Sequence, residues 1–169
     1  MDTTSHNFLV TPQIYASKEK RFANMIIDIA GVYIFTILFG VIIGLIALLG
    51  IEGPLNYFST ITRIEDYIVS ILIGLVYFAL METIFQKSLG KFVTKTVVVL
   101  EDGSKPSSGD IFIRSLCRYI PFEAFSFLGD QGRGWHDSIS ETYVVDEAKF
   151  RAKKNAEQEL ELIGKSIVE

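Results

Sequence analysis

Two charged residues stand at the start of a long apolar stretch, where an ion pair or an ion-coupling site could form. Arg21 and Asp28 are seven residues apart, so two helical turns place them on one face. From Ile29 the chain carries no charge until Glu52, which is long enough for a helix to cross a hydrocarbon layer of about 30 Å. A carboxylate inside such a span costs up to about 2.5–3.5 kcal/mol at mid-bilayer, and less near the edge. We therefore expect Asp28 to have a partner.

A second acid, Glu82, lies near the end of the next apolar stretch, which covers residues 67–85. If this stretch returns the chain across the membrane, Glu82 approaches the depth of Asp28 from the neighbouring helix. A carboxylate there could either join a charge cluster or reach the interface without a specific partner.

A third apolar stretch, residues 111–128, contains two arginines, an acid and a proline. Arg114 and Arg118 are four residues apart and share one helical face, while Pro121 interrupts the backbone hydrogen bonds of a helix. A lipid-facing span tolerates such a combination poorly. The stretch is therefore predicted to lie at the interface or to re-enter the same side, with its arginines directed at the first two helices or at lipid phosphates.

The composition places these residues in an integral membrane protein of one domain. The 169 residues are 49% apolar and 21% charged, and the mean hydropathy is +0.34. A soluble protein with two buried helices is the alternative, but the apolar content is concentrated in two blocks of spanning length. The first block is too long for a signal peptide and is expected to stay in the mature chain.

Known site chemistries find little support in the sequence. One cysteine, Cys117, and two histidines predict neither a disulfide framework nor a metal site, and no cofactor is expected. The segment at 88–91 lacks the first glycine of a phosphate loop. His136 and Asp137 are adjacent and are not expected to face each other. No nucleophile or oxyanion site is evident, so the chain is predicted not to be an enzyme, and nothing in it predicts nucleic-acid binding.

The positions of basic residues predict how the chain crosses the membrane, and residue patterns predict a β-ribbon and a helix-packing face. Basic residues precede the first span, follow the second and follow the third stretch, so both termini are expected in the cytoplasm. Residues 94–100 and 141–145 are β-branched and should pair as a cytoplasmic ribbon. Gly40 and Gly44 form a GxxxG pattern that permits close helix packing, including dimerisation.

The predicted fold is an all-α membrane protein with two transmembrane helices, a third re-entrant or interfacial helical segment, a small cytoplasmic β-ribbon and a C-terminal cytosolic helix. Residues 1–15 form a mobile cytoplasmic N-terminus and 16–146 the membrane domain, with spans at 23–49 and 67–85. Residues 147–169 form a helical tail. An apolar stripe on that tail, expected to dock on the domain or on a partner, is formed by Ala156, Leu160, Ile163 and Ile167.

Four sequence segments, taken together, resemble the RDD family of small bacterial membrane proteins. These are RFANMIID, SLGKFVTKTVVVLEDG, IRSLCR and WHDSISETYVV, which fall within residues 16–146. The resemblance implies a place in the bacterial inner membrane and singles out Arg21, Asp28 and Asp137 as the family's arginine and two aspartates. It says little about activity, although a few members are linked to monovalent-cation/proton antiport.

With Asp137 included, the expected cluster comprises Arg21, Asp28, Glu82, Arg114, Arg118 and Asp137. Such a cluster suits an ion-coupling site, and equally a structural clasp that holds the third segment against the first. We predict a membrane scaffold or adaptor, or a subunit of a membrane complex. The alternative is a monovalent cation/proton antiporter that uses Asp28 in an oligomer, because two spans alone cannot enclose a pathway. The expected partners are the lipid bilayer and either a second copy or another membrane protein.

Overall fold

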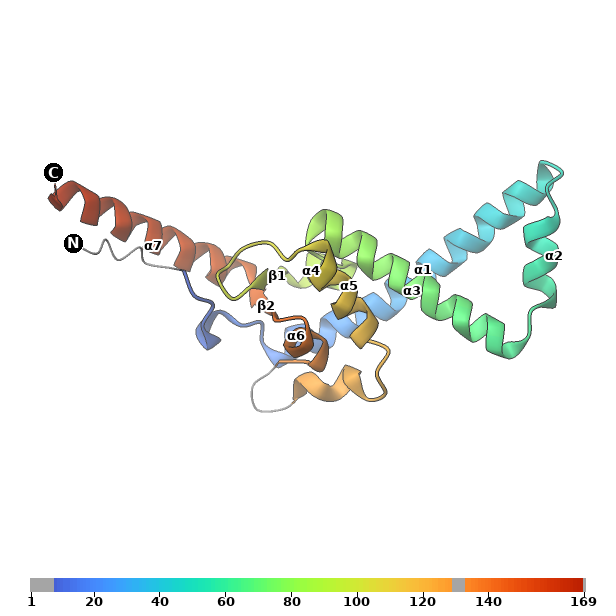
Figure 1. The fold of residues 1–169 in the computed structure, drawn as a ribbon, viewed down its shortest axis with the longest axis horizontal. Coiled ribbons are helices and arrows are strands. Elements are labelled where there is room, and N and C mark those ends of the chain that lie inside the picture. Colours follow the sequence, from blue (N-terminus) through green and yellow to red (C-terminus); the bar gives the residue numbers. More distant parts are fainter. Residues whose placement is uncertain (1–7, 129–132, 169) are drawn as a thin grey trace.

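The structure, a computed structural model, describes residues 8–128 and 133–168, and it is mostly helical and elongated (Figure 1). One end is a helical pair joined by a short helix. The middle is a compact part made of short helices and a two-stranded ribbon. At the other end a single helix projects away. In chain order the elements are η1 (Pro12–Ile14), α1 (Lys18–Leu48), α2 (Gly53–Thr60), α3 (Arg63–Phe85), α4 (Leu89–Thr94), β1 (Thr96–Leu100), α5 (Ser108–Cys117), η2 (Glu123–Leu128), α6 (Trp135–Ile139), β2 (Thr142–Asp146) and α7 (Glu147–Val168).

Helices α1 and α3 are the two described helices that are long and apolar enough to cross a membrane, which agrees with the two predicted spans. Helix α1 begins after Ser17, whose side chain accepts a hydrogen bond from the backbone of Lys20. Helix α3 begins with a capping box between Thr62 and Glu65. Most of the side chains on both helices are exposed in the isolated chain, and these exposed residues are predominantly apolar. This surface is suited to lipid contact.

The connection between the spans is itself helical, which the sequence analysis did not predict. Pro54 lies in the first turn of α2. Proline is well suited to that position because its missing N–H would have no partner inside the helix.

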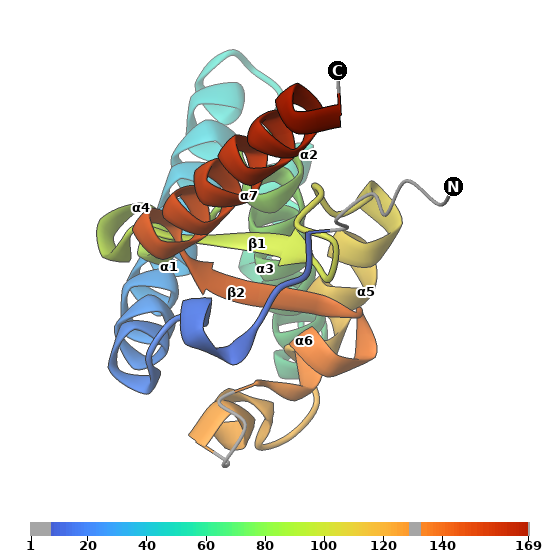
Figure 2. The ribbon, with the colours of Figure 1, turned by 90° about the vertical axis from the view of Figure 1, so that its left-hand side faces the viewer.

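The predicted β-ribbon is present. β1 and β2 pair antiparallel, with Val98 opposite Val144. One face of the ribbon packs on Val10 and Ile14 of the N-terminal segment and on Phe150 of α7. The other face carries Thr96, Val98, Thr142 and Val144, all buried. Seen from the end at which α7 projects, the strands lie side by side, with α1 and α3 behind them (Figure 2).

The third apolar stretch is not one helix. Helix α5 covers ten residues, Ser108–Cys117, and a turn around Pro121 separates it from the 3-10 helix η2. Ten helical residues extend about 15 Å, half the thickness of the hydrocarbon layer. The short helix thus excludes a simple third span within this described segment, and its position relative to a membrane stays a prediction.

Helix α7 follows β2 directly and leaves the compact part after its first turns. Phe150 packs edge-to-face on Phe8, and Lys153 donates to the backbone oxygen of Leu9 at 2.5 Å. Beyond these contacts, Leu160 and Ile163 of the predicted stripe are 66% and 56% exposed. The side chain of Ile167 lies outside the described residues. Leu160 therefore does not pack on the described part of its own domain, and the docking of the stripe as a whole stays a prediction.

Candidate functional site

Arg114 of α5 lies at the centre of a buried charge network and is completely inaccessible to solvent. Its Nε donates to Glu82 Oε2 of α3 at 3.0 Å. Its Nη1 donates to a carboxylate oxygen of Asp137 on α6 and, at 2.7 Å, to the hydroxyl of Thr142 on β2. A single side chain thus links the second span to the two elements that follow the third apolar stretch.

Asp137 connects this network to the first span. Arg21 of α1 donates to Asp137 Oδ2, and the backbone amide of Gly134 donates to the same oxygen at 3.0 Å. Burial alone would raise the pKa of Asp137, but Arg114, His136 and Arg21 together hold that pKa well below its usual value. Asp137 is therefore ionised in the folded protein, with an arginine on each carboxylate oxygen.

Glu82 is fully buried and accepts from three cations, of which Arg114 is one. Lys91 of α4 donates to its Oε1 at 2.7 Å and Arg118 donates to the same oxygen at 2.9 Å. The Arg118 guanidinium also lies 4.2 Å from the ring centroid of Phe78, a cation–π contact. Glu82 thus joins a charge cluster and does not reach the interface without a specific partner.

Asp28 lies beside this network but is held differently from the expectation that an arginine would pair with it. Its Oδ2 accepts from the Ser88 hydroxyl at 2.6 Å, and its Oδ1 accepts from the Gly90 amide at 2.8 Å and from the Tyr77 hydroxyl at 3.3 Å. Asp28 thus binds the first turn of α4, as a capping carboxylate does. Its partners are neutral donors rather than arginines.

Helix α4 can donate to Asp28 because it packs closely against α1. A Cβ added to Gly90 would lie 2.5 Å from the backbone oxygen of Asn24, so only glycine lets α4 lie directly on α1. Gly40 and Gly44, by contrast, have no atom within 4 Å of an added Cβ among the described residues. Their predicted packing role is not exercised inside the chain and stays a prediction about a second molecule.

His136 has two acidic neighbours. Its Nδ1 contacts Glu123 Oε1 of η2, and its Nε2 lies 3.1 Å from Asp137 Oδ1. The expectation that the adjacent His136 and Asp137 would not face each other is wrong, because both lie in the first turn of α6 and the imidazole is long enough to fold back. Each group also has a further partner, Glu123 for His136 and the two arginines for Asp137.

Sequence reasoning missed Lys91 and the donors to Asp28. Lys91 is one of the basic residues that follow the second span and predict its cytoplasmic side, but its side chain is buried and paired with Glu82. A hydroxyl and an amide give no charge signal, so Ser88 and Gly90 could not be identified as partners from the sequence. Among the described residues, no group of three or more His, Cys, Asp or Glu side chains is placed to hold a metal ion.

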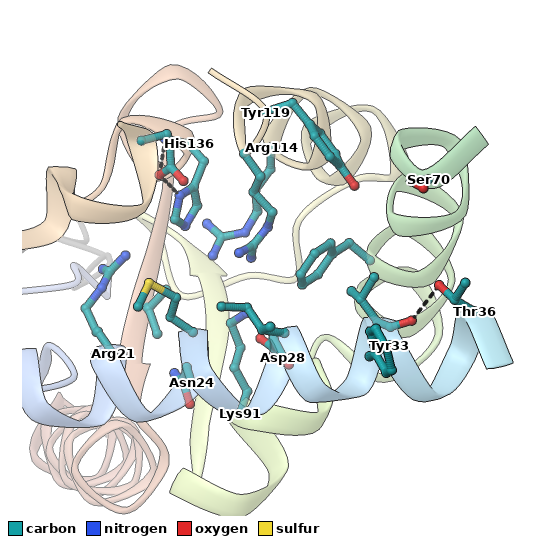
Figure 3. Close-up of a pocket in the computed structure, with 17 residues that line it drawn as sticks. Arg21, Asn24, Asp28, Tyr33, Thr36, Ser70, Lys91, Arg114, Tyr119 and His136 are labelled. Carbon is teal, nitrogen blue, oxygen red and sulfur yellow. Dashed lines mark hydrogen bonds and ion pairs between the residues drawn. The ribbon is translucent and has the colours of Figure 1, made fainter. Parts of the chain in front are cut away.

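A cavity of about 470 Å³ lies beside the network, between α1, α3 and α5 (Figure 3). Arg21, Asn24 and Asp28 line it from α1, and Arg114 reaches toward it from α5. Further along α1, the lining mixes the apolar side chains of Ile29 and Val32 with the hydroxyls of Tyr33, Thr36 and Ser70. The charged side chains of the lining thus gather at one end of the cavity, and the other end carries apolar and uncharged polar groups.

These features define a class: a membrane protein in which two apolar helices carry a compact part held to them by buried ion pairs. The sequence profile of the RDD family matches residues 15–141, most of the chain, and the chain belongs to this family. No curated protein and no solved structure matches it. Of the three residues that the family resemblance singled out, Arg21 and Asp137 contact each other, whereas Asp28 holds α4.

Proposed function

We propose that this RDD protein is a membrane scaffold or adaptor, or a subunit of a membrane complex, and that it presents helix α7 to a protein partner. The observation that carries the proposal is the exposed apolar stripe on α7. Leu160 lies outside the contacts that fix the start of the helix and is 66% exposed, and Ala156 on the same face is exposed as well. An apolar stripe on a charged helix stabilises the chain only when another surface covers it.

The charge network supports a structural rather than a relay role. Both carboxylate oxygens of Asp28, Glu82 and Asp137 accept hydrogen bonds from groups of the protein itself. These bonds join α1, α3, α4, α5 and α6 into one unit. Such a unit can hold α7 in a fixed direction, which an adaptor requires.

The basic residues around the spans support an orientation with both termini in the cytoplasm of a bacterial inner membrane. In that orientation the ribbon and α7 face the cytoplasm, and the partner would be a cytoplasmic protein or the cytoplasmic part of a complex. A second copy of the chain could also cover the stripe.

One feature favours the alternative, cation/proton exchange at Asp28 in an oligomer: Asp28 lines the cavity. Acids in spans that transport ions must release and rebind protons. Against this, both carboxylate oxygens of Asp28 are bound by groups of the protein itself, the Ser88 hydroxyl and the Gly90 amide, as in a structural contact between α1 and α4.

The test of the adaptor role is affinity purification of the full-length protein with the double variant Leu160→Ser/Ile163→Ser. We expect a partner that co-purifies in stoichiometric amount with the wild type and is lost with this variant. A matched control, Asn155→Ser/Gln158→Ser, changes the opposite side of α7 and should retain the partner. Unchanged co-purification with both variants would contradict the proposal, as would the absence of any stoichiometric partner, including a second copy.

A further inference from the structure

The cavity beside the charge network contains two hydrogen-bond donors that the described residues leave unsatisfied. Arg114 Nη2 and Arg118 Nε are both buried, and neither has a partner there. Both arginines line the cavity. Because a buried donor without an acceptor is unfavourable, such groups are uncommon in folded proteins. Arg114 lies in α5 and Arg118 directly follows it, so an acceptor from outside the described residues that entered the cavity could satisfy both donors.

The geometry of the guanidinium group indicates which kinds of acceptor fit. Its planar N–H donors match the oxygens of phosphate or carboxylate groups. Asp28 and Glu123 also line the cavity, so the charged end presents acceptors as well as donors. A phosphate whose head group also carries hydroxyl donors satisfies both, whereas a choline head group brings a cation but no hydroxyl donor.

The other end of the cavity fits a hydrocarbon chain. Its lining includes Ile29 and Val32 beside the uncharged hydroxyls of Thr36 and Ser70, and Ile29 is 61% exposed on α1. From Arg21 to Thr36, both of which line the cavity, α1 rises about 22 Å. The cavity therefore runs from the charged boundary of the span well into its apolar part, as a lipid does. At 470 Å³ it lies within the range of small-molecule sites.

We propose that this cavity binds one anionic phospholipid of the phosphatidylglycerol type. On binding, the guanidinium groups of Arg114 and Arg118 turn toward the cavity so that Nη2 and Nε donate to the phosphate, the head-group hydroxyls donate to the acids at the charged end, and an acyl chain lies along Ile29 and Val32. This site is independent of the proposed adaptor role, because it involves no residue of α7.

The experiment titrates the purified full-length protein in maltoside detergent with three probes: dioctanoylphosphatidylglycerol, dioctanoylglycerol and inorganic phosphate. Native mass spectrometry counts bound lipid, and the melting temperature reports binding. We expect one retained phosphatidylglycerol with saturable stabilisation, and at least tenfold weaker effects from the other two probes. Arg118→Leu, which leaves the ion pairs of Arg114 in place, should weaken binding roughly tenfold.

Val32→Trp fills the uncharged end and should abolish binding, whereas Val41→Trp places the same ring on an exposed part of α1 and should not. Wild-type binding in Val32→Trp, or equal loss in Val41→Trp, would overturn the site. Equal binding of dioctanoylglycerol would exclude phosphate recognition, and equal stabilisation by inorganic phosphate would exclude a lipid. If Val32→Trp does not fold, unchanged affinity in Arg118→Leu is sufficient to reject the proposal.

Discussion

Replacing Arg21 by methionine tests how the charge network holds the first span. The fully buried Asp137 would lose one of its two arginines but keep Arg114 and the Gly134 amide. Removing one member of a buried ion pair typically costs about 3–5 kcal/mol. Because Asp137 keeps a second arginine, we expect a loss near the lower end, about 3 kcal/mol. In an Asp137→Asn background the same change should cost less, giving a coupling energy of about 1–3 kcal/mol.

A double-mutant cycle of Arg21 with Asp28 should, by contrast, give almost no coupling energy. Arg21 and Asp28 share a face of α1, but their separation along the helix axis is about 10 Å. Asp28 is bound by Ser88 and Gly90, which Arg21 does not need for its contact with Asp137. Sites this far apart usually add within about 0.5 kcal/mol. Asp28→Asn should still destabilise the protein, by about 1–3 kcal/mol, because the buried amide of Gly90 loses a charged acceptor.

The free energies are measured by equilibrium unfolding in mixed micelles of maltoside and dodecyl sulfate, with all single and double variants in one detergent ratio series. Melting temperatures provide a second measurement of the same rank order. If the coupling of Arg21 with Asp28 is larger than that with Asp137, the arrangement described here is wrong and an Arg21–Asp28 clasp is supported instead.

Three further predictions follow from individual contacts. Gly90→Ala should destabilise the protein by about 1–3 kcal/mol through overpacking against α1, whereas Gly44→Ala, in open space, should change stability by less than about 1 kcal/mol; equal effects would contradict the close approach. The folded-state pKa of Asp137 is depressed, so its stabilisation is present above the usual pKa of 3.8 and is lost as pH falls toward the folded value; unfolding measured from pH 7 to 2 should show a weaker acid dependence in Asp137→Asn, and an unchanged slope would refute this. Leu160→Cys in a Cys117→Ser background should resist impermeant maleimide in intact cells, and ready labelling from outside would place α7 on the other side of the membrane.

The elements with strong local patterns could be predicted from the sequence. Two uninterrupted apolar stretches of sufficient length predicted the two spans. Two segments rich in β-branched residues, each in need of a pairing partner for its backbone, predicted the ribbon. The third stretch was harder, because its apolar content did not show where helix α5 ends. Pro121 signalled an interruption, and the structure places the end of α5 four residues earlier, at Cys117.

Five of the buried charged residues were correctly predicted to cluster, namely Arg21, Glu82, Arg114, Arg118 and Asp137, but Lys91 was missed and the pairing was not predictable. Arg21 and Asp28 share a helical face, which suggested a pair, yet each is bound by an element that returns from far along the chain. The return of α4 depends on Gln86, which ends α3 in a left-handed conformation with φ 57°, and on the close approach at Gly90. Sequence spacing contains no direct sign of either feature, so the pairing of Lys91 with Glu82 was also missed.

The most direct test of the central claim, that the buried charges clamp the fold rather than carry ions, is a flux assay. Purified protein in proteoliposomes containing a pH-sensitive dye receives pulses of Na⁺, Li⁺ and K⁺, beside Asp28→Asn and protein-free vesicles. A structural network predicts no dye response above that of protein-free vesicles with any cation, together with a lowered melting temperature for Asp28→Asn. A cation-dependent proton release that is lost in Asp28→Asn, with its melting temperature unchanged, would contradict the account.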